Sequence, residues 1–160
     1  MTTLCDIRPF RECDGEPVSS LIRRNLLEVN TRDYPLEDMQ RLCDVFSPER
    51  VTEFSRQREM FVAEAEGQIV GTAGLARDSR TSEVWYIALT VFVLPEFHGR
   101  GVGSRLMDAV ESAARAKGAT ALRLPASLTG VEFYRRRGYV EDADSPPYPA
   151  SDVVPMVKNL

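Results

Sequence analysis

The sequence predicts a single domain built on a mixed α/β sheet, and three observations lead to this class. The chain has 160 residues, enough for one full hydrophobic core and too few for two. Three strand-like segments follow one another between residues 60 and 94, as in an antiparallel meander. Later strand-like segments alternate with helical ones. We therefore expect one domain over residues 1–160, with about six to seven strands and about four helices, and not a doubly wound sheet.

The N-terminal part of the chain combines one short strand with helices. Residues 4–8 are strand-like. Apolar residues recur with helical spacing across residues 18–46, interrupted at residues 30–35, which predicts two amphipathic helices. Ser47 followed by Pro48 is typical of a third helix start, because serine caps free amides and proline suits the first turn.

The three consecutive strands are separated by polar turns. Residues 60–65 and 68–76 are strand-like, and Glu66-Gly67 between them predicts a tight hairpin turn. Residues 83–94 form the next expected strand. This segment is apolar almost throughout from Val84, which is typical of a central strand covered on both faces.

The C-terminal part returns to alternating elements. Residues 101–117 have a helical apolar pattern, and Gly118 is a helix stop. A short strand over residues 121–124 and a short helix over residues 129–137 follow. The last segments are two closing strands and the loop between them, rich in proline and acid: residues 139–141, 153–157 and 142–152.

Composition argues against several classes of protein. Hydrophobic residues make up 43% and charged residues 28%, and the net charge of −4 disfavours nucleic acid or anionic membranes as partners. Cys5, Cys13 and Cys43 lack metal-site spacing and the chain has one histidine, so we expect no metal. The first ten residues carry Asp6 and Arg8 and do not resemble a targeting peptide, which predicts a cytoplasmic protein.

The most informative segment is His-Gly-Arg-Gly-Val-Gly at residues 98–103, between an expected strand and an expected helix. Alternating glycines let the backbone approach a ligand closely, and the following helix directs its free amides at the loop. Such geometry suits phosphate. Ser104-Arg105 rules out a Walker loop, and serine replaces the third glycine of a dinucleotide fingerprint. A kinase loop would precede a strand, whereas a helix follows here.

A fourth interpretation fits these residues. The loop follows Val-Leu-Pro at residues 93–95 and resembles the Gln/Arg-x-x-Gly-x-Gly/Ala motif of the GNAT superfamily of acetyl-CoA-dependent acetyltransferases. His98 takes the Gln/Arg place, and Gly101 and Gly103 take the two small positions. A second segment, Phe-Tyr-Arg-Arg-Arg-Gly-Tyr at residues 133–139, resembles the family's Phe-Tyr-x-x-x-Gly-Phe/Tyr.

The resemblance implies acetyl-CoA as the co-substrate and a sheet in which two neighbouring strands splay apart. Loop amides would hold the diphosphate, and main-chain groups near Phe92 and Val93 would pair with the pantetheine. Arg100 is either a phosphate ligand or a solvated arginine, and Ser127 either replaces a cofactor-contacting asparagine or caps a helix. The expected cofactor-binding residues are Phe92, Val93, His98, Gly99, Arg100, Gly101, Val102, Gly103, Ser104 and Ser127.

The resemblance also assigns catalytic groups. Tyr134 matches the family tyrosine that donates a proton to the departing thiolate, and a main-chain amide near Val93 would stabilise the acetyl oxygen. Glu83 is the expected base, with Tyr86 as a rival on the same strand. The arginines at residues 135–137 span more than one helix face, so one of them could reach the ribose phosphate while the others are solvated.

These residues predict an N-acetyltransferase in which an amine attacks the thioester directly. The acceptor should lie between residues 30–35 and residues 142–152, and a small molecule is favoured. Two alternatives stay open, a coenzyme A-binding sensor without catalysis and a structural protein that binds no coenzyme A. A homodimer is compatible with the family. The acidic residues that suggest a cationic acceptor are Asp33, Glu37, Asp38, Asp142, Asp144 and Asp152.

Overall fold

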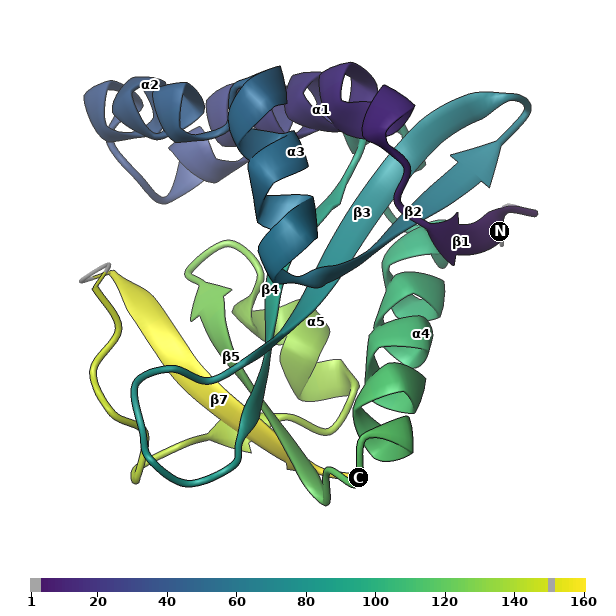
Figure 1. Cartoon of the computed structure of the whole chain (residues 1–160). Helices are drawn as coiled ribbons and strands as arrows, with labels where there is room; N and C mark the ends of the chain where they lie inside the picture. The colour runs from purple at the N-terminus through teal and green to yellow at the C-terminus, as the bar shows by residue number, and fades with distance from the viewer. Residues whose placement is uncertain (1–3, 150–151) are drawn as a thin grey trace.

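The computed structural model describes residues 4–149 and 152–160 (Figure 1). These residues form one seven-stranded sheet in the order β1-β2-β3-β4-β5-β7-β6, in which β4 and β5 are parallel and the other neighbours antiparallel. The strands are β1 (Asp6–Pro9), β2 (Glu59–Ala65), β3 (Gln68–Arg77), β4 (Tyr86–Val93), β5 (Ala121–Ser127), β6 (Val140–Glu141) and β7 (Val153–Asn159). The predicted mixed α/β class is confirmed.

Five α-helices flank this sheet in the described part of the chain, where about four were expected. They are α1 (Gly15–Glu28), α2 (Leu36–Val45), α3 (Pro48–Gln57), α4 (Val102–Ala116) and α5 (Val131–Arg136). Short 3-10 helices span Glu12–Asp14, Asn30–Arg32 and Pro95–Phe97. No helix in residues 4–149 or 152–160 combines the length and hydrophobicity needed to cross a bilayer.

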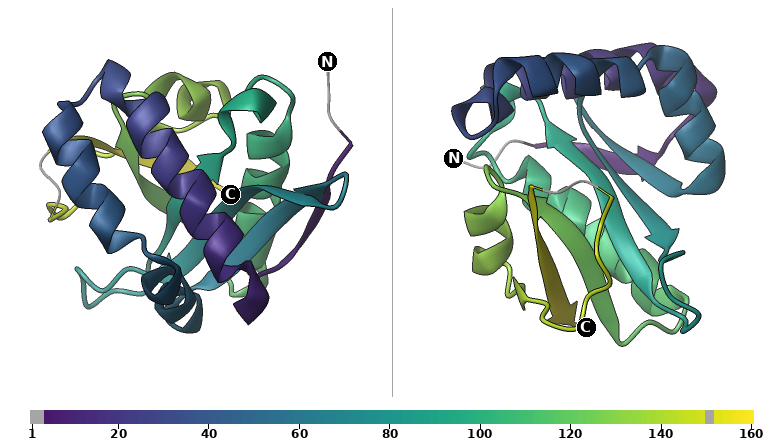
Figure 2. Two further views of the ribbon diagram at one scale, coloured as in Figure 1. Left: turned by 90° about the horizontal axis from the view of Figure 1, so that it is seen from above. Right: turned by 90° about the vertical axis from the view of Figure 1, so that its left-hand side faces the viewer.

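The helices cover both faces of the sheet (Figures 1 and 2). Helix α1 packs against β3 and β4 on one face, and α4 packs against β2, β3 and β4 on the other. Their apolar stripes form the core: Ile22 of α1 and Leu106 of α4 are fully buried. Both helices thereby fix the two sides of β4, the strand that leads into the glycine loop.

Local signals in the sequence account for several element boundaries. The Ser47 hydroxyl accepts a hydrogen bond from the Arg50 amide at 3.3 Å, which caps α3 as predicted. Glu66 and Gly67 have φ angles of 54° and 75° and form the predicted turn between β2 and β3. Gly118, with φ of 85°, ends α4.

The predicted start of the third meander strand is wrong. Strand β4 begins at Tyr86, and Glu83 lies in the preceding loop. The Asp78 carboxylate binds the side chain of Arg80, and Arg80 also donates to the Pro146 carbonyl at 2.5 Å. These bonds hold residues 78–85 as a loop although Val84 and Trp85 are apolar.

Strands β4 and β5 separate along their length, as the family resemblance implied. They pair only at Ile87 and Arg123. Beyond that point β4 carries a bulge at Thr90, whose φ is 58°, and its register against β3 shifts. Arg58 donates to the Thr90 hydroxyl at 2.5 Å and so holds the bulge in place. The bulge turns the end of β4 away from β5 and opens the gap between them.

Candidate active site

The glycine loop joins β4 to α4 and has the backbone geometry of a phosphate cradle. Gly99 and Gly101 have φ angles of 74° and 83°, a left-handed conformation that strains other residues. Gly101 is the N-cap of α4, so the first amides of this helix face the loop. A Cβ at Gly103 would stand 3.2 Å from the Phe133 ring, so glycine lets α5 approach α4 closely. The loop therefore fits an anionic group such as a diphosphate.

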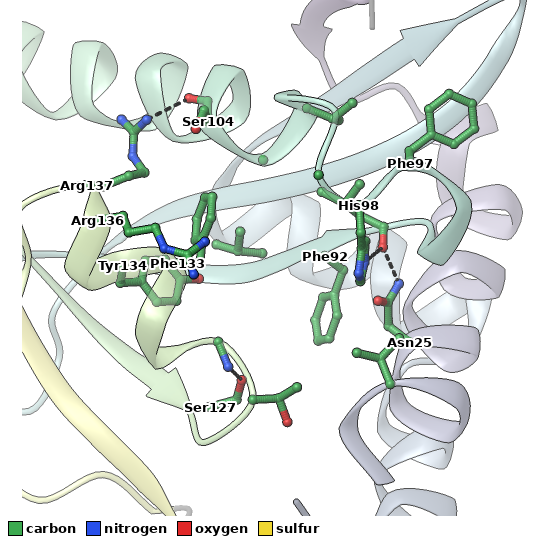
Figure 3. Close-up of a pocket in the computed structure, with 18 of the residues that line it drawn as sticks. Asn25, Phe92, Phe97, His98, Ser104, Ser127, Phe133, Tyr134, Arg136 and Arg137 are labelled. Carbon is green, nitrogen blue, oxygen red and sulfur yellow. Dashed lines mark hydrogen bonds between the residues drawn. The ribbon is translucent and has the colours of Figure 1, made fainter. Parts of the chain in front are cut away.

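A cavity of about 770 Å³ extends from this loop along the gap between β4 and β5 (Figure 3). Arg100 does not line it, and its guanidinium lies over the Phe97 ring at 5.1 Å from the centroid. The predicted site residues that do line the cavity are Phe92, Val93, His98, Gly99, Gly101, Val102, Gly103, Ser104, Ser127 and Tyr134. The structure thus brings most of the predicted cofactor-binding residues to one place.

The end of β4 presents only part of its main chain to this cavity. The Leu94 amide donates to Val70 of β3, so the amide and carbonyl of Val93 point away from β3, toward the gap. The Val93 carbonyl accepts from His98 Nε2 and from Asn25 Nδ2, both at 2.7 Å. A carbonyl has two lone pairs, so it is saturated, and His98 carries its proton on Nε2. The Val93 amide is therefore what remains for a ligand.

Tyr134 of α5 lines the cavity beside Phe133, on the side opposite Asn25 (Figure 3). Burial raises the pKa of its hydroxyl above the ordinary value of 10.0, so the phenol is neutral at physiological pH. The rings of Phe133 and Tyr139 stand edge-on to it, with centroids at 5.1 and 5.8 Å. These contacts fix the ring, while the hydroxyl accepts or donates no hydrogen bond within the described chain. Tyr134 thus presents a neutral, oriented phenol to the cavity.

A second pocket of about 500 Å³ adjoins the first, on the side of α1 and α2. Most of its lining is apolar, and its carboxylates are Asp38 and Asp152. The Tyr34 hydroxyl accepts from the Leu128 amide at 2.9 Å and donates to the Asp152 carbonyl at 2.5 Å, which links the two sides. This is where the sequence predicted the acceptor. The residues shared by both pockets are Asn30, Val91, Phe92, Ser127 and Tyr134.

Neither expected base lies in these pockets. Glu83 is exposed in the loop before β4, where its carboxylate accepts from Trp85 Nε1 at 3.2 Å. Tyr86 is the first residue of β4, at the end opposite the glycine loop, and lines neither pocket. The base role assigned to Glu83 depended on a strand that carries it toward the site, and the loop over residues 78–85 removes that support.

Ser127 caps the turn before α5 and also lines the cavity. Its Oγ accepts from the Gly130 amide at 3.1 Å, which caps the turn before α5. Because that bond uses a lone pair, the hydroxyl proton stays available to a ligand. Both interpretations of Ser127 are thus compatible with the geometry.

The three consecutive arginines have different environments. Arg135 pairs with Glu132 and Glu141 on the surface. Arg137 donates to the Ser104 carbonyl at 3.2 Å and to two carboxylates on α4. Arg136 lines the cavity and makes no ion pair or side-chain hydrogen bond with the described residues. It is the arginine of the three whose whole guanidinium is without a partner in the described residues, whereas in Arg137 only the buried Nε lacks one.

A buried carboxylate holds Arg137 in position. Burial alone would raise the pKa of Glu111, but hydrogen bonds from Lys158, Arg137 and Tyr139 outweigh it and lower that pKa. Glu111 is therefore ionised near neutral pH, and the cations around it are oriented. Lys158 and Arg137 add positive charge at the edge of the cavity. This network stabilises the end of the site expected to hold phosphate.

Asn25 is the most informative residue that sequence reasoning missed. It lies on α1 among the buried apolar positions, beside Ile22 and Leu26, and its side chain is buried. A polar residue on an apolar stripe was a usable signal, because a buried amide needs partners. Arg136 was one of three candidates, and only the structure separates it from its neighbours.

The fold and the cavity together define an acyltransferase with a splayed-strand cofactor cleft. The sequence model of the acetyltransferase (GNAT) domain matches residues 56–141, more than half of the chain. The chain therefore belongs to the GNAT family of acetyltransferases. The matched segment holds the glycine loop and Tyr134 but not Asn25.

Solved structures agree with this fold over the whole chain. A GCN5-related N-acetyltransferase from Rhodopseudomonas palustris has a TM-score of 0.83 at 22% identity, covering 100% of this chain and 98% of that one. PaiA N-acetyltransferase from Thermoplasma acidophilum, solved with coenzyme A, has a TM-score of 0.83 at 18% identity over 99% and 100%. Ard1 from Thermoplasma volcanium has a TM-score of 0.67 at 26% identity over 98% and 97%.

Proposed function

We propose that this acetyltransferase moves the acetyl group of acetyl-CoA to the amine of a small molecule, within a single catalytic domain over residues 1–160. The observation that carries the proposal is the position of Tyr134, which lines both the cavity next to the glycine loop and the second pocket. A donor and an acceptor bound on either side would meet at its hydroxyl.

Coenzyme A fits the first cavity by its chemistry. The amides around Gly101 suit its diphosphate, and the free amide of Val93 suits a carbonyl of its pantetheine arm. When bound, acetyl-CoA supplies an activated acetyl group. The coenzyme A complex of the Thermoplasma acidophilum protein, which shares the fold, supports this assignment.

The chain's own residues then serve the transfer. The ammonium of the acceptor first loses a proton to solvent, and the neutral amine attacks the thioester carbon. Tyr134 is neutral and buried, so it donates a proton to the sulfur as the C–S bond breaks, and it regains a proton from the attacking nitrogen, which leaves the amide and the free thiol. Stabilising negative charge on the acetyl oxygen needs a further main-chain amide near Val93, because the Val93 amide itself is assigned to the pantetheine arm. Asp152, together with the Asp38 oxygen that does not bind Arg41, attracts a cationic amine to the second pocket. The apolar lining there favours an amine carried on an apolar body.

Thiol release from acetyl-CoA, measured against a panel of amines, tests this proposal. We expect turnover with apolar amines such as phenethylamine or hexylamine, and less with the anionic glucosamine 6-phosphate. The matched control is phenethyl alcohol, which has the same body without the amine and should give no release. Coenzyme A binding without thiol release for any amine would instead support the sensor.

Arg136 gives a separate prediction about the ribose phosphate. Because it lines the cavity without a partner in the described chain, we expect Arg136→Ala to raise the KM for acetyl-CoA about 5- to 10-fold. The KM for acetyl-dephospho-CoA, which lacks the 3′-phosphate, should change less than about 2-fold. Arg135→Ala is the matched control, since Arg135 pairs with Glu132 away from the cavity. Equal effects of both substitutions would contradict the assignment.

A further inference from the structure

Asn25 presents an unpaired amide oxygen to the cofactor cavity. Its side chain is 4% exposed, and both hydrogens of Nδ2 are used, toward the Leu21 carbonyl at 2.9 Å and the Val93 carbonyl at 2.7 Å. Because both partners are carbonyls, they fix which end of the amide is nitrogen. The oxygen Oδ1 must therefore face the other way, and no group in the described residues donates to it.

The free oxygen lies on the cavity side. Asn25 lines the cavity next to the glycine loop and does not line the second pocket. In Figure 3 it stands across the cavity from Ser127 and Tyr134, with its amide oxygen toward Phe92. Oδ1 is not among the fully buried side-chain atoms without a partner in the described residues, so it is accessible from the cavity, where a ligand or water can donate to it. The donor that satisfies it is thus expected from the cofactor rather than from the acceptor.

The hydrogen-bonding groups left free at the end of β4 indicate which group of the ligand donates to Asn25 Oδ1. A ligand that adds to a strand end pairs with both an amide and a carbonyl. Val93 offers its amide, but its carbonyl is saturated by Asn25 and His98. The arm of coenzyme A between diphosphate and thiol carries two secondary amides, each with an N–H donor.

We propose that Asn25 Oδ1 accepts a hydrogen bond from an amide N–H of the pantetheine arm of coenzyme A, in place of the Val93 carbonyl that Asn25 itself occupies. This inference rests on the proposed function and assigns a cofactor-binding role to a helix outside the glycine loop. One side chain then performs two tasks, since Nδ2 anchors the end of β4 and Oδ1 holds the cofactor beside it.

Asn25→Ala isolates the second task. After the substitution the Val93 carbonyl keeps His98 Nε2, and the Leu21 carbonyl keeps the helical amide of residue 25. The main chain around the site therefore stays satisfied. If Asn25→Ala does not fold, Asn25→Ser leaves a smaller void and serves as the second variant.

Calorimetric binding of two ligands tests the proposal. The first is coenzyme A, and the second is adenosine 3′-phosphate 5′-diphosphate, which has the same phosphates but no pantetheine arm. We expect Asn25→Ala to weaken coenzyme A about 3- to 10-fold, the loss of one neutral hydrogen bond, and to change binding of the nucleotide less than about 2-fold. Coenzyme A analogues with ester oxygen in place of either amide N–H complete the test. For the wild type, one of the two analogues should bind more weakly than coenzyme A. For Asn25→Ala, that analogue and coenzyme A should bind with equal affinity.

Each other outcome is decisive. Asn25→Ala also frees a lone pair of the Val93 carbonyl, which can then accept the same N–H. Unchanged affinity of Asn25→Ala for coenzyme A, together with wild-type affinity for both ester analogues equal to that for coenzyme A, would show that Oδ1 does not touch the arm. Equal weakening of both ligands would show that Asn25 acts only through the loop. If the wild type binds neither ligand, the proposed function is wrong. If the wild type binds coenzyme A and the Asn25 variant behaves identically with every ligand, only the role of Asn25 is wrong.

Discussion

Replacing Tyr134 with phenylalanine should lower kcat by about 100-fold or more and change the KM for acetyl-CoA less than about 3-fold. The hydroxyl is the only group removed, and no described residue bonds to it, so the fold should keep its stability. Burial raises the pKa of this phenol, so the wild-type rate should not fall between about pH 8 and 10 through its ionisation. Steady-state kinetics of thiol release across that range measure all three quantities.

Tyr139→Phe is the matched control for this prediction. Its hydroxyl donates to Glu111 Oε2 at 2.9 Å, and Tyr139 lines neither pocket. We expect it to lower the free energy of unfolding by about 1 kcal/mol and to leave kcat nearly unchanged. The two tyrosines should therefore show opposite effects, one on rate and one on stability. Equal kcat values for wild type and Tyr134→Phe would show that another group protonates the sulfur.

Gly101→Glu should abolish measurable binding of coenzyme A, by at least about 100-fold, because a carboxylate would stand among amides that suit a diphosphate. Like charges brought together in this way cost several kcal/mol. The φ of 83° at Gly101 adds backbone strain that affects stability in addition to binding. Calorimetry measures the affinity, and thermal unfolding measures the strain.

Gly118→Glu separates these two effects. Gly118 has nearly the same φ, 85°, but it lies at the far end of α4, where no heavy atom stands within 4 Å of an added Cβ. It should lose similar stability and keep its affinity for coenzyme A. If both variants lose affinity equally, the loss comes from strain in α4, and the loop is not the phosphate site.

Elements with a strong local signal could be predicted from the sequence. The cap at Ser47 and the turn at Gly67 act within a few residues, so composition alone reveals them. The start of β4 could not be predicted in this way, because it depends on the hydrogen bond from Arg80 to the carbonyl of Pro146, a residue distant in sequence. The apolar residues Val84 and Trp85 in the loop before β4 gave the sequence a strand-like pattern there.

In the candidate site, too, residues in local sequence motifs could be predicted and residues that depend on distant contacts could not. Residues of the glycine loop and Tyr134 form contiguous motifs, and the structure places them around one cavity. The roles proposed for Asn25 and Arg136 depend on the cavity that each side chain lines and on which of its polar atoms lack a partner. Both properties can be read only from the folded structure. The position of Glu83 was predicted wrongly for the same reason, since it depended on where a strand begins.

A crystal structure of the protein with coenzyme A tests the central claim most directly. We predict that the diphosphate lies within hydrogen-bond distance of the main-chain amides from Gly99 to Ser104, and that the thiol lies beside the Tyr134 hydroxyl. A diphosphate bound elsewhere on the molecule, or a thiol remote from Tyr134, would contradict the proposed reaction.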